Sequence, residues 1–142
     1  MIILDTGPLI ALFDPKDPDY KACHKVLRTI EEPLYTTEAV LTEVLYAFDP
    51  ASRGAEGIKE YFLNEYVSLC ALAKIDIERS FEFMNKYGDL PMDFADATLL
   101  ALAESLGTRK IFTLDFKDFN VYQYKKGHRY YSLNLIGRDL LE

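Results

Sequence analysis

Cysteine, tryptophan and histidine are scarce in this 142-residue chain, which has two Cys, no Trp and two His. Cys23 and Cys70 form no CxxC pair, which excludes a cysteine-based zinc site and a disulfide framework. We expect both to be small buried hydrophobic side chains in a reducing compartment. The first residues also lack a basic segment leading into a long apolar run, so we expect no signal peptide, no membrane anchor and a cytoplasmic location.

Glycine and proline are also few, with 7 and 6 residues, against 49% hydrophobic residues. This composition excludes collagen-like, low-complexity and disordered classes. A chain of this length has the size of one hydrophobic core, so we expect a single domain over residues 1–142.

Basic residues are outnumbered by acidic ones, 16 against 23, which makes the net charge −7. Residues 109–142 are the exception, with 7 basic and 4 acidic side chains, and there aromatic residues are interspersed with Lys125, Lys126, His128 and Arg129. This mixture is typical of a surface that contacts nucleic-acid phosphates and bases. It is equally typical of an edge strand with lysines on one face and aromatic side chains toward the core.

Short apolar runs alternate with segments of helical period along the chain. Proline fits the first helical position, so we expect Pro8 and Pro91 to begin helices and Gly107 to end the second of these. The alternation predicts an α/β fold, doubly wound in three layers around a central parallel sheet of four or five strands. The predicted strands lie near residues 2–5, 34–36, 67–72, 110–114 and 130–133, and the other predicted helices near 20–30, 38–48, 55–64 and 76–87.

Two aspartates, Asp5 and Asp115, each follow directly on a predicted apolar strand. A single aspartate after a strand is commonly a turn residue. In doubly wound sheets, however, ligands bind at the carboxyl ends of the strands, so two such aspartates favour a functional site at that edge. Each has a hydroxyl neighbour, Thr6 and Thr113.

Asp96 lies within the apolar face of the helix predicted after Pro91, when successive residues are placed about 100° apart. Because burial of an unpaired carboxylate is costly, Asp96 must be neutralised, hydrogen-bonded or bound to a metal. Asp93 lies at the edge of this face, where a helix-dipole role and a role in a site are equally consistent. Glu43 lies just beyond the apolar face of its predicted helix, a position that taken alone predicts a surface residue.

Acidic side chains gathered without Lys or Arg repel one another at low dielectric, so a divalent cation is their natural counter-charge. Oxygen ligands without Cys or His favour Mg²⁺ or Mn²⁺ over zinc. We therefore expect metal-assisted hydrolysis of a phosphodiester or phosphomonoester. The sequence lacks the GxSxG, GxxxxGKS/T and GxGxxG motifs of other catalytic and nucleotide-binding classes.

Four short motifs occur in order along the chain: ILDTGPL from Ile3, TT from Thr36 with Val40 and Glu43, LPMDFADA from Leu90, and TLD from Thr113 followed by Asp118 and Phe119. Together they resemble the motifs of PIN domains, similar to the VapC-type toxins of bacterial and archaeal toxin–antitoxin pairs. The resemblance implies a metal-dependent endoribonuclease whose catalytic residues are Asp5, Glu43, Asp96 and Asp115.

On this basis we expect Asp5, Asp96 and Asp115 to hold Mg²⁺ or Mn²⁺, and Glu43 to orient the attacking water or hold a second ion. Accessory candidates are Asp93, Thr6 and Thr113. The resemblance also implies an RNA substrate, a cognate antitoxin protein and a homodimer. Two alternatives stay open: a non-catalytic PIN-fold module that binds RNA or protein, and a small-molecule phosphohydrolase.

Overall fold

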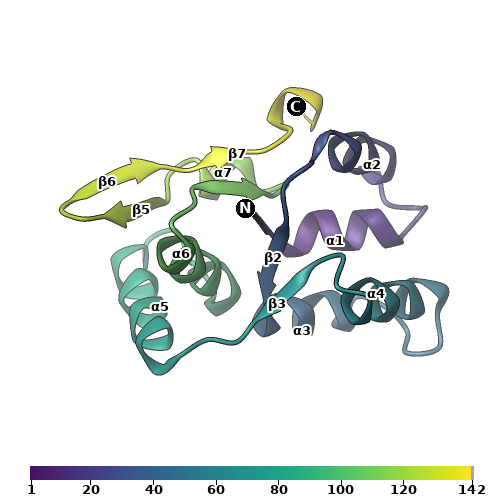
Figure 1. Cartoon of the computed structure of the whole chain (residues 1–142), viewed down its shortest axis with the longest axis horizontal. Coiled ribbons are helices and arrows are strands. Elements are labelled where there is room, and N and C mark those ends of the chain that lie inside the picture. Colours follow the sequence, from purple (N-terminus) through teal and green to yellow (C-terminus); the bar gives the residue numbers. More distant parts are fainter. Residues whose placement is uncertain (142) are drawn as a thin grey trace.

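The computed structural model describes residues 1–141, which form a main sheet covered by helices and a separate β-hairpin (Figure 1). The main sheet contains β1 (Ile2–Leu4), β2 (Leu34–Thr37), β3 (Ser68–Cys70), β4 (Lys110–Phe112) and β7 (Asn134–Leu135). The hairpin contains β5 (Gln123–Lys126) and β6 (Arg129–Ser132). The helices are α1 (Thr6–Phe13), α2 (Tyr20–Thr29), α3 (Glu38–Tyr46), α4 (Arg53–Leu63), α5 (Lys74–Lys86), α6 (Phe94–Leu106), α7 (Phe116–Phe119) and α8 (Arg138–Leu141).

The main sheet has the strand order β3-β2-β1-β4-β7, and all neighbouring strands are parallel. Its central strands are apolar on both faces, and Ile3, Leu4, Ile111 and Phe112 are fully buried. Figure 1 shows α1, α2 and α4 on one side of the sheet and α5 and α6 on the other. The predicted α/β fold with a parallel sheet of up to five strands is therefore confirmed. Within residues 1–141, no helix is long and apolar enough to cross a membrane.

Strand β1 is the place where the chain changes direction across the sheet. From β1 the chain proceeds outward through β2 to β3, and it then returns to add β4 on the other side of β1. In open α/β sheets, such a switch point lies beside the crevice in which ligands bind, at the carboxyl ends of the strands. Asp5 leaves β1 at this end and Asp115 follows β4.

Helix α6 ends as predicted but begins later than predicted. Its C-cap is Gly107 in the left-handed conformation, with φ of 70°, which glycine adopts at little cost. Its first residue is Phe94 and not Pro91, because the carboxylate of Asp93 accepts a hydrogen bond from the Asp96 amide and caps the helix at that point.

The strand predicted near residues 130–133 is not part of the main sheet. It corresponds to β6, which pairs with β5 in an antiparallel hairpin closed at Gly127, where φ is 63°. The fifth strand of the main sheet is β7, whose two residues are too few to give a strand pattern in the sequence.

Two smaller expectations also need correction. Pro8 is the third residue of α1 and not the first, because Asp5 is the N-cap and Thr6 begins the helix. Cys23 is buried as expected, whereas Cys70 lies on the edge strand β3 and is only partly buried.

Candidate active site

Asp5 is held in a fixed orientation at the end of β1. Its side chain is 7% exposed; Oδ1 accepts a hydrogen bond from the Thr6 amide, and Oδ2 accepts one from the Thr113 hydroxyl, both at 2.7 Å. Burial raises the pKa of Asp5 to about 6 in spite of these hydrogen bonds, and the charges of Glu43 and Asp115 contribute to the rise. The structure thus keeps an ionisable carboxylate out of water without a cationic partner.

Asp115 lies at the equivalent end of β4 and is the N-cap of α7. Its amide donates to the Thr113 hydroxyl at 3.0 Å, and its Oδ1 accepts from the Asp118 amide at 3.1 Å. Burial raises the pKa of Asp115, and the charge of Asp118 adds to the effect. Thr113 therefore bonds to the side chain of one site aspartate and to the backbone of the other.

Asp96 projects from the first turn of α6. Its pKa rises to about 8, first because of burial and then because of the charges of Asp5, Asp93, Asp115 and Glu43. Four other acidic side chains repel the negative charge of Asp96, so its charged form is unfavourable at this position. A perturbation of this kind is typical of functional sites.

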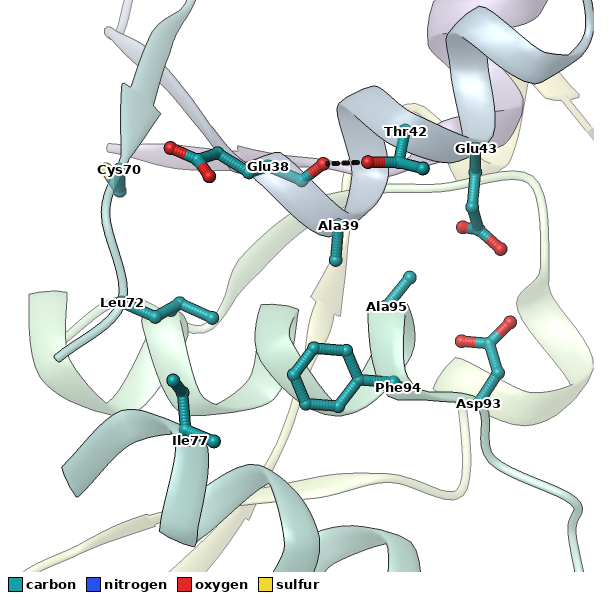
Figure 2. A pocket seen from close by; sticks show the side chains of 10 residues that line it. All are labelled: Glu38, Ala39, Thr42, Glu43, Cys70, Leu72, Ile77, Asp93, Phe94 and Ala95. Atoms are coloured by element: carbon teal, nitrogen blue, oxygen red, sulfur yellow. Dashed lines mark hydrogen bonds between the residues drawn. The ribbon is translucent and has the colours of Figure 1, made fainter. Parts of the chain in front are cut away.

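Glu43 is exposed on α3, as its position on the helix predicts, yet it takes part in the same cluster. Its Oε1 accepts a hydrogen bond of 2.8 Å from the Thr6 hydroxyl, which joins α3 to the beginning of α1. Burial and the nearby Asp93 raise the pKa of Glu43. Figure 2 shows the carboxylates of Glu43 and Asp93 pointing toward each other from two elements.

The cluster fits an open divalent-cation site, not a closed cage. Within residues 1–141, no group of three acidic, histidine or cysteine side chains converges closely enough to enclose a metal ion. Mg²⁺ typically uses only one or two protein carboxylates and keeps several waters. In the described part of the chain, none of the four predicted catalytic acids forms a salt bridge. A hard cation would supply the missing positive charge.

An open cavity of about 630 Å³ adjoins the acidic cluster. Glu43 and Asp93 lie at one end of it, and Leu72, Ile77 and Phe94 form an apolar surface at the other (Figure 2). This apolar lining is not among the features predicted from the sequence. In the structure, Ile77 lies on a face of α5 that is exposed to solvent.

Tyr122, one of the aromatic residues of the basic segment 109–142, is a neighbour of the cluster and faces the core, which is one of the two alternatives that the sequence leaves open for that segment. It is fully buried, with its ring against those of Phe119 and Tyr87 at centroid distances of 5.1 and 4.9 Å. Burial, and then the charges of Asp96 and Asp118, raise the pKa of its phenol. Its hydroxyl has no hydrogen-bond partner among residues 1–141.

The chain is similar to known proteins in sequence and in fold. The family model of the PIN domain matches residues 2–123. Ribonuclease VapC26 of Mycobacterium tuberculosis (strain ATCC 25618 / H37Rv) is 29% identical over 133 residues, which cover 91% of this chain and 97% of that protein. The crystal structure of M. tuberculosis VapC20, described as a sarcin-ricin loop cleaving toxin, superposes with a TM-score of 0.75 at 18% identity, over 82% of this chain and 92% of that one. Since the family model covers most of its length, the chain belongs to the PIN domain family.

Proposed function

We propose that this protein is a metal-dependent endoribonuclease and the toxin of a toxin–antitoxin pair. The observation that carries the proposal is the set of Asp5, Asp96 and Asp115, which the fold gathers at the switch point of the sheet with raised pKa values and no salt bridge. The similarity to a protein named as a ribonuclease supports RNA as the substrate.

In this proposal, Asp5, Asp96 and Asp115 hold Mg²⁺ or Mn²⁺ directly or through bound waters. A bound ion of this kind lowers the pKa of its water and offsets charge on the phosphate. The protein's own groups prepare the ligands. The hydroxyl of Thr113 and the amide of Thr6 fix the two carboxylate oxygens of Asp5.

Glu43 orients the attacking water, and the hydroxyl of Thr6 holds the Glu43 carboxylate toward the cluster. The raised pKa of Glu43 makes it a better acceptor for a water proton than an ordinary glutamate. Asp93 fixes the first turn of α6, and with it the backbone of Asp96, through its capping hydrogen bond.

A toxin of this kind acts in the cytoplasm, as a homodimer, and is neutralised by an antitoxin. The cavity beside the acids supports the last part, because its apolar surface at Leu72, Ile77 and Phe94 offers burial to a protein segment that covers the cluster. Co-expression with the protein encoded by the neighbouring reading frame, followed by gel filtration, tests both the antitoxin and the dimer.

The experiment that tests the enzymatic proposal is incubation of the purified protein with ribosomal RNA and a sarcin–ricin stem-loop in EDTA, Mg²⁺, Mn²⁺ or Zn²⁺. We expect cleavage with Mg²⁺ and Mn²⁺ only. Cleavage that survives dialysis against EDTA would contradict the role of the metal. RNA binding without cleavage under every condition would favour a non-catalytic module, and hydrolysis of small phosphate esters alone would favour a phosphohydrolase.

A further inference from the structure

The β5–β6 hairpin lies beyond the part of the chain that the family model matches. That match ends at residue 123, where β5 begins. The hairpin extends away from the main sheet at one end of the molecule (Figure 1). At its tip, an added side-chain atom on Gly127 would meet nothing within 4 Å, so the tip is open to solvent.

The hairpin is basic, in contrast to the acidic body of the protein. Residues 123–132 contain Lys125, Lys126 and Arg129 and no acidic residue, whereas residues 1–108 contain 9 basic and 19 acidic side chains. The three basic side chains are exposed, and within residues 1–141 none of them forms a salt bridge. Their charges are therefore available to an anionic partner.

Contacts with α5 and α6 hold the hairpin in place. The amide of Lys125 donates to Glu104 Oε1 at 2.8 Å. Arg79 already neutralises Glu104 through two hydrogen bonds, from Nε at 2.8 Å and from Nη2 at 3.0 Å. Lys86 adds a further cation near the tip of the hairpin, with its Nζ 3.8 Å from the ring centre of Tyr130, which is paired with Lys125. The basic surface is thus anchored without being neutralised.

Helix α6 connects the hairpin to the acidic cluster. Asp96 lies in its first turn and Glu104, which contacts the hairpin, lies near its end. These two residues are eight positions apart, or about 12 Å along the helix. The contact between α6 and the hairpin thus lies about two helical turns from the acidic cluster, although α6 itself is buried over residues 97–103 between them.

We propose that Lys125, Lys126 and Arg129 of this hairpin bind the RNA backbone at phosphates adjacent to the cleaved one. The inference rests on the proposed ribonuclease function and identifies where such an enzyme holds its substrate. The acidic cluster repels phosphate unless a cation is bound, so affinity for a long RNA requires positive charge elsewhere.

The arrangement of the charges favours RNA over an acidic protein as the partner. Directly opposite residues of an antiparallel pair share one face, so Lys126 and Arg129 lie on one face of the hairpin, and Lys125 lies with Tyr130 on the other. Cations on both faces of a narrow tip suit a flexible polyanion that passes around it, whereas a protein surface would engage one face. The exposed Tyr130 ring is contacted by Lys86, whose Nζ lies 3.8 Å from the ring centre, so the Lys125 face also has a second cation beside it.

The test compares two triple variants of equal charge change. The first replaces Lys125, Lys126 and Arg129 with Gln, and the control replaces Lys21, Lys25 and Arg28, which are exposed on α2, with Gln. Cleavage of a labelled single-stranded RNA of about 20 nucleotides is followed at several salt concentrations. Binding of the same RNA is measured by anisotropy on chains that also carry Asp96→Asn, so that the RNA is not cut.

We expect the hairpin variant to raise KM and the binding Kd at least about tenfold at low salt, with a smaller effect on kcat. The slope of log Kd against log salt concentration should fall by about 2, since each of the three contacts with a phosphate of single-stranded RNA contributes about 0.7. The α2 variant should match the parent. If the hairpin triple variant fails to fold, the single variants provide the same test, each with about a third of the change in slope.

A hairpin variant that matches the α2 variant in Kd and salt slope would overturn the inference. A hairpin variant that keeps its affinity for RNA and loses only its affinity for a protein partner would also overturn it. The binding measurement does not depend on catalysis. If the parent cleaves no RNA with any metal, the proposed function fails. The salt dependence of RNA binding still shows in that case whether the hairpin residues bind RNA.

Discussion

The carboxyl group of Asp96 is the clearest point at which stability and function conflict in this molecule. It is partly buried on α6, and the charges of four other acids raise its pKa. No protein hydrogen bond to its side chain is found among residues 1–141. A residue that only stabilised the fold would have such partners, and this is the reason for which we propose that Asp96 binds a metal ion.

We therefore predict that Asp96→Asn raises the melting temperature in EDTA at neutral pH, because it removes a carboxyl group whose charged form is disfavoured in the folded state by burial and by the neighbouring acids. The same variant should lose cleavage and the stabilisation that Mg²⁺ gives the parent. Thermal melting of both proteins with and without Mg²⁺ checks this. A variant that melts below the parent in EDTA, or that gains as much from Mg²⁺, would show that Asp96 is a structural residue.

The stability difference between parent and variant should also depend on pH. The pKa of Asp96 is about 8 in the folded protein against an ordinary value of 3.8, so between these pH values the folded state binds more protons than the unfolded state. The stability of the parent in EDTA should consequently fall as the pH rises from about 4 to 8, and Asp5, with a pKa of about 6, adds to the fall. The advantage of Asp96→Asn should thus be small near pH 5 and large near pH 8, as measured by chemical denaturation. A constant difference across this range would contradict the assigned pKa.

Individual residues differ in how far the sequence alone could identify them. Asp5 and Asp115 follow apolar strands, and Asp96 interrupts an apolar helix face, so physical patterns alone made them candidates. Glu43 could be assigned only through the family resemblance, because its proximity to the site depends on the Thr6 hydroxyl, which lies 37 residues away in sequence. The burial of Tyr122 likewise depends on tertiary packing, against Tyr87 of another segment.

At the scale of elements, the ends of α6 illustrate which local signals dominate. Gly107 fits the left-handed cap that ends the helix, and the sequence predicts it directly. At the other end, Pro91 is compatible with a helix start, but Asp93 supplies the side-chain acceptor that satisfies a free backbone amide. The cap at Asp93 determines where the helix begins because it adds a hydrogen bond to the Asp96 amide. A proline in the first turn adds none and only lacks an amide that would have had no partner there.

The capping role of Asp93 can be separated from its charge by two neutral substitutions. Asp93→Asn keeps an acceptor for the Asp96 amide, whereas Asp93→Ala removes it, and both relieve repulsion with Glu43. We predict that the Ala variant is less stable than the Asn variant by about 1 kcal/mol. Urea denaturation measures the difference. Equal stability would mean that the cap contributes nothing, and loss of cleavage in both variants would place the Asp93 charge in the chemistry.

The last part of the sheet could not be predicted for a related reason. The residues with the strongest strand pattern near the end of the chain, around Tyr130, pair locally with β5 because Gly127 permits a tight turn between them. The main sheet is completed by β7, which is short and pairs with β4; the Asn134 amide donates to the carbonyl of Arg109, the residue before β4. The strong strand pattern around Tyr130 thus belongs to a local hairpin. The strand that completes the main sheet has a weak pattern because distant residues hold it in place.

At the scale of the whole molecule, the strand order explains why residues from four distant segments meet. Because β1 and β4 are adjacent and parallel, Asp5 and Asp115 leave the sheet at the same edge although 110 positions separate them. Helices α3 and α6 contribute Glu43 and Asp96. Alternation of strands and helices predicts a sheet of this kind, and the rule for switch points then predicts the edge at which the acids gather.

The measurement that tests this account most directly is the rate of Mg²⁺-dependent RNA cleavage by the parent, by Asp5→Asn and Asp96→Asn, and by Asp89→Asn, which alters an exposed acid outside the cluster. We predict that the two cluster variants lose more than about a hundredfold in rate at any Mg²⁺ concentration, since the loss of a supporting residue alone costs about 10–100-fold. Asp89→Asn should cleave as the parent does. Cleavage by either cluster variant at the parent's rate would contradict the assignment of these carboxylates to the metal site.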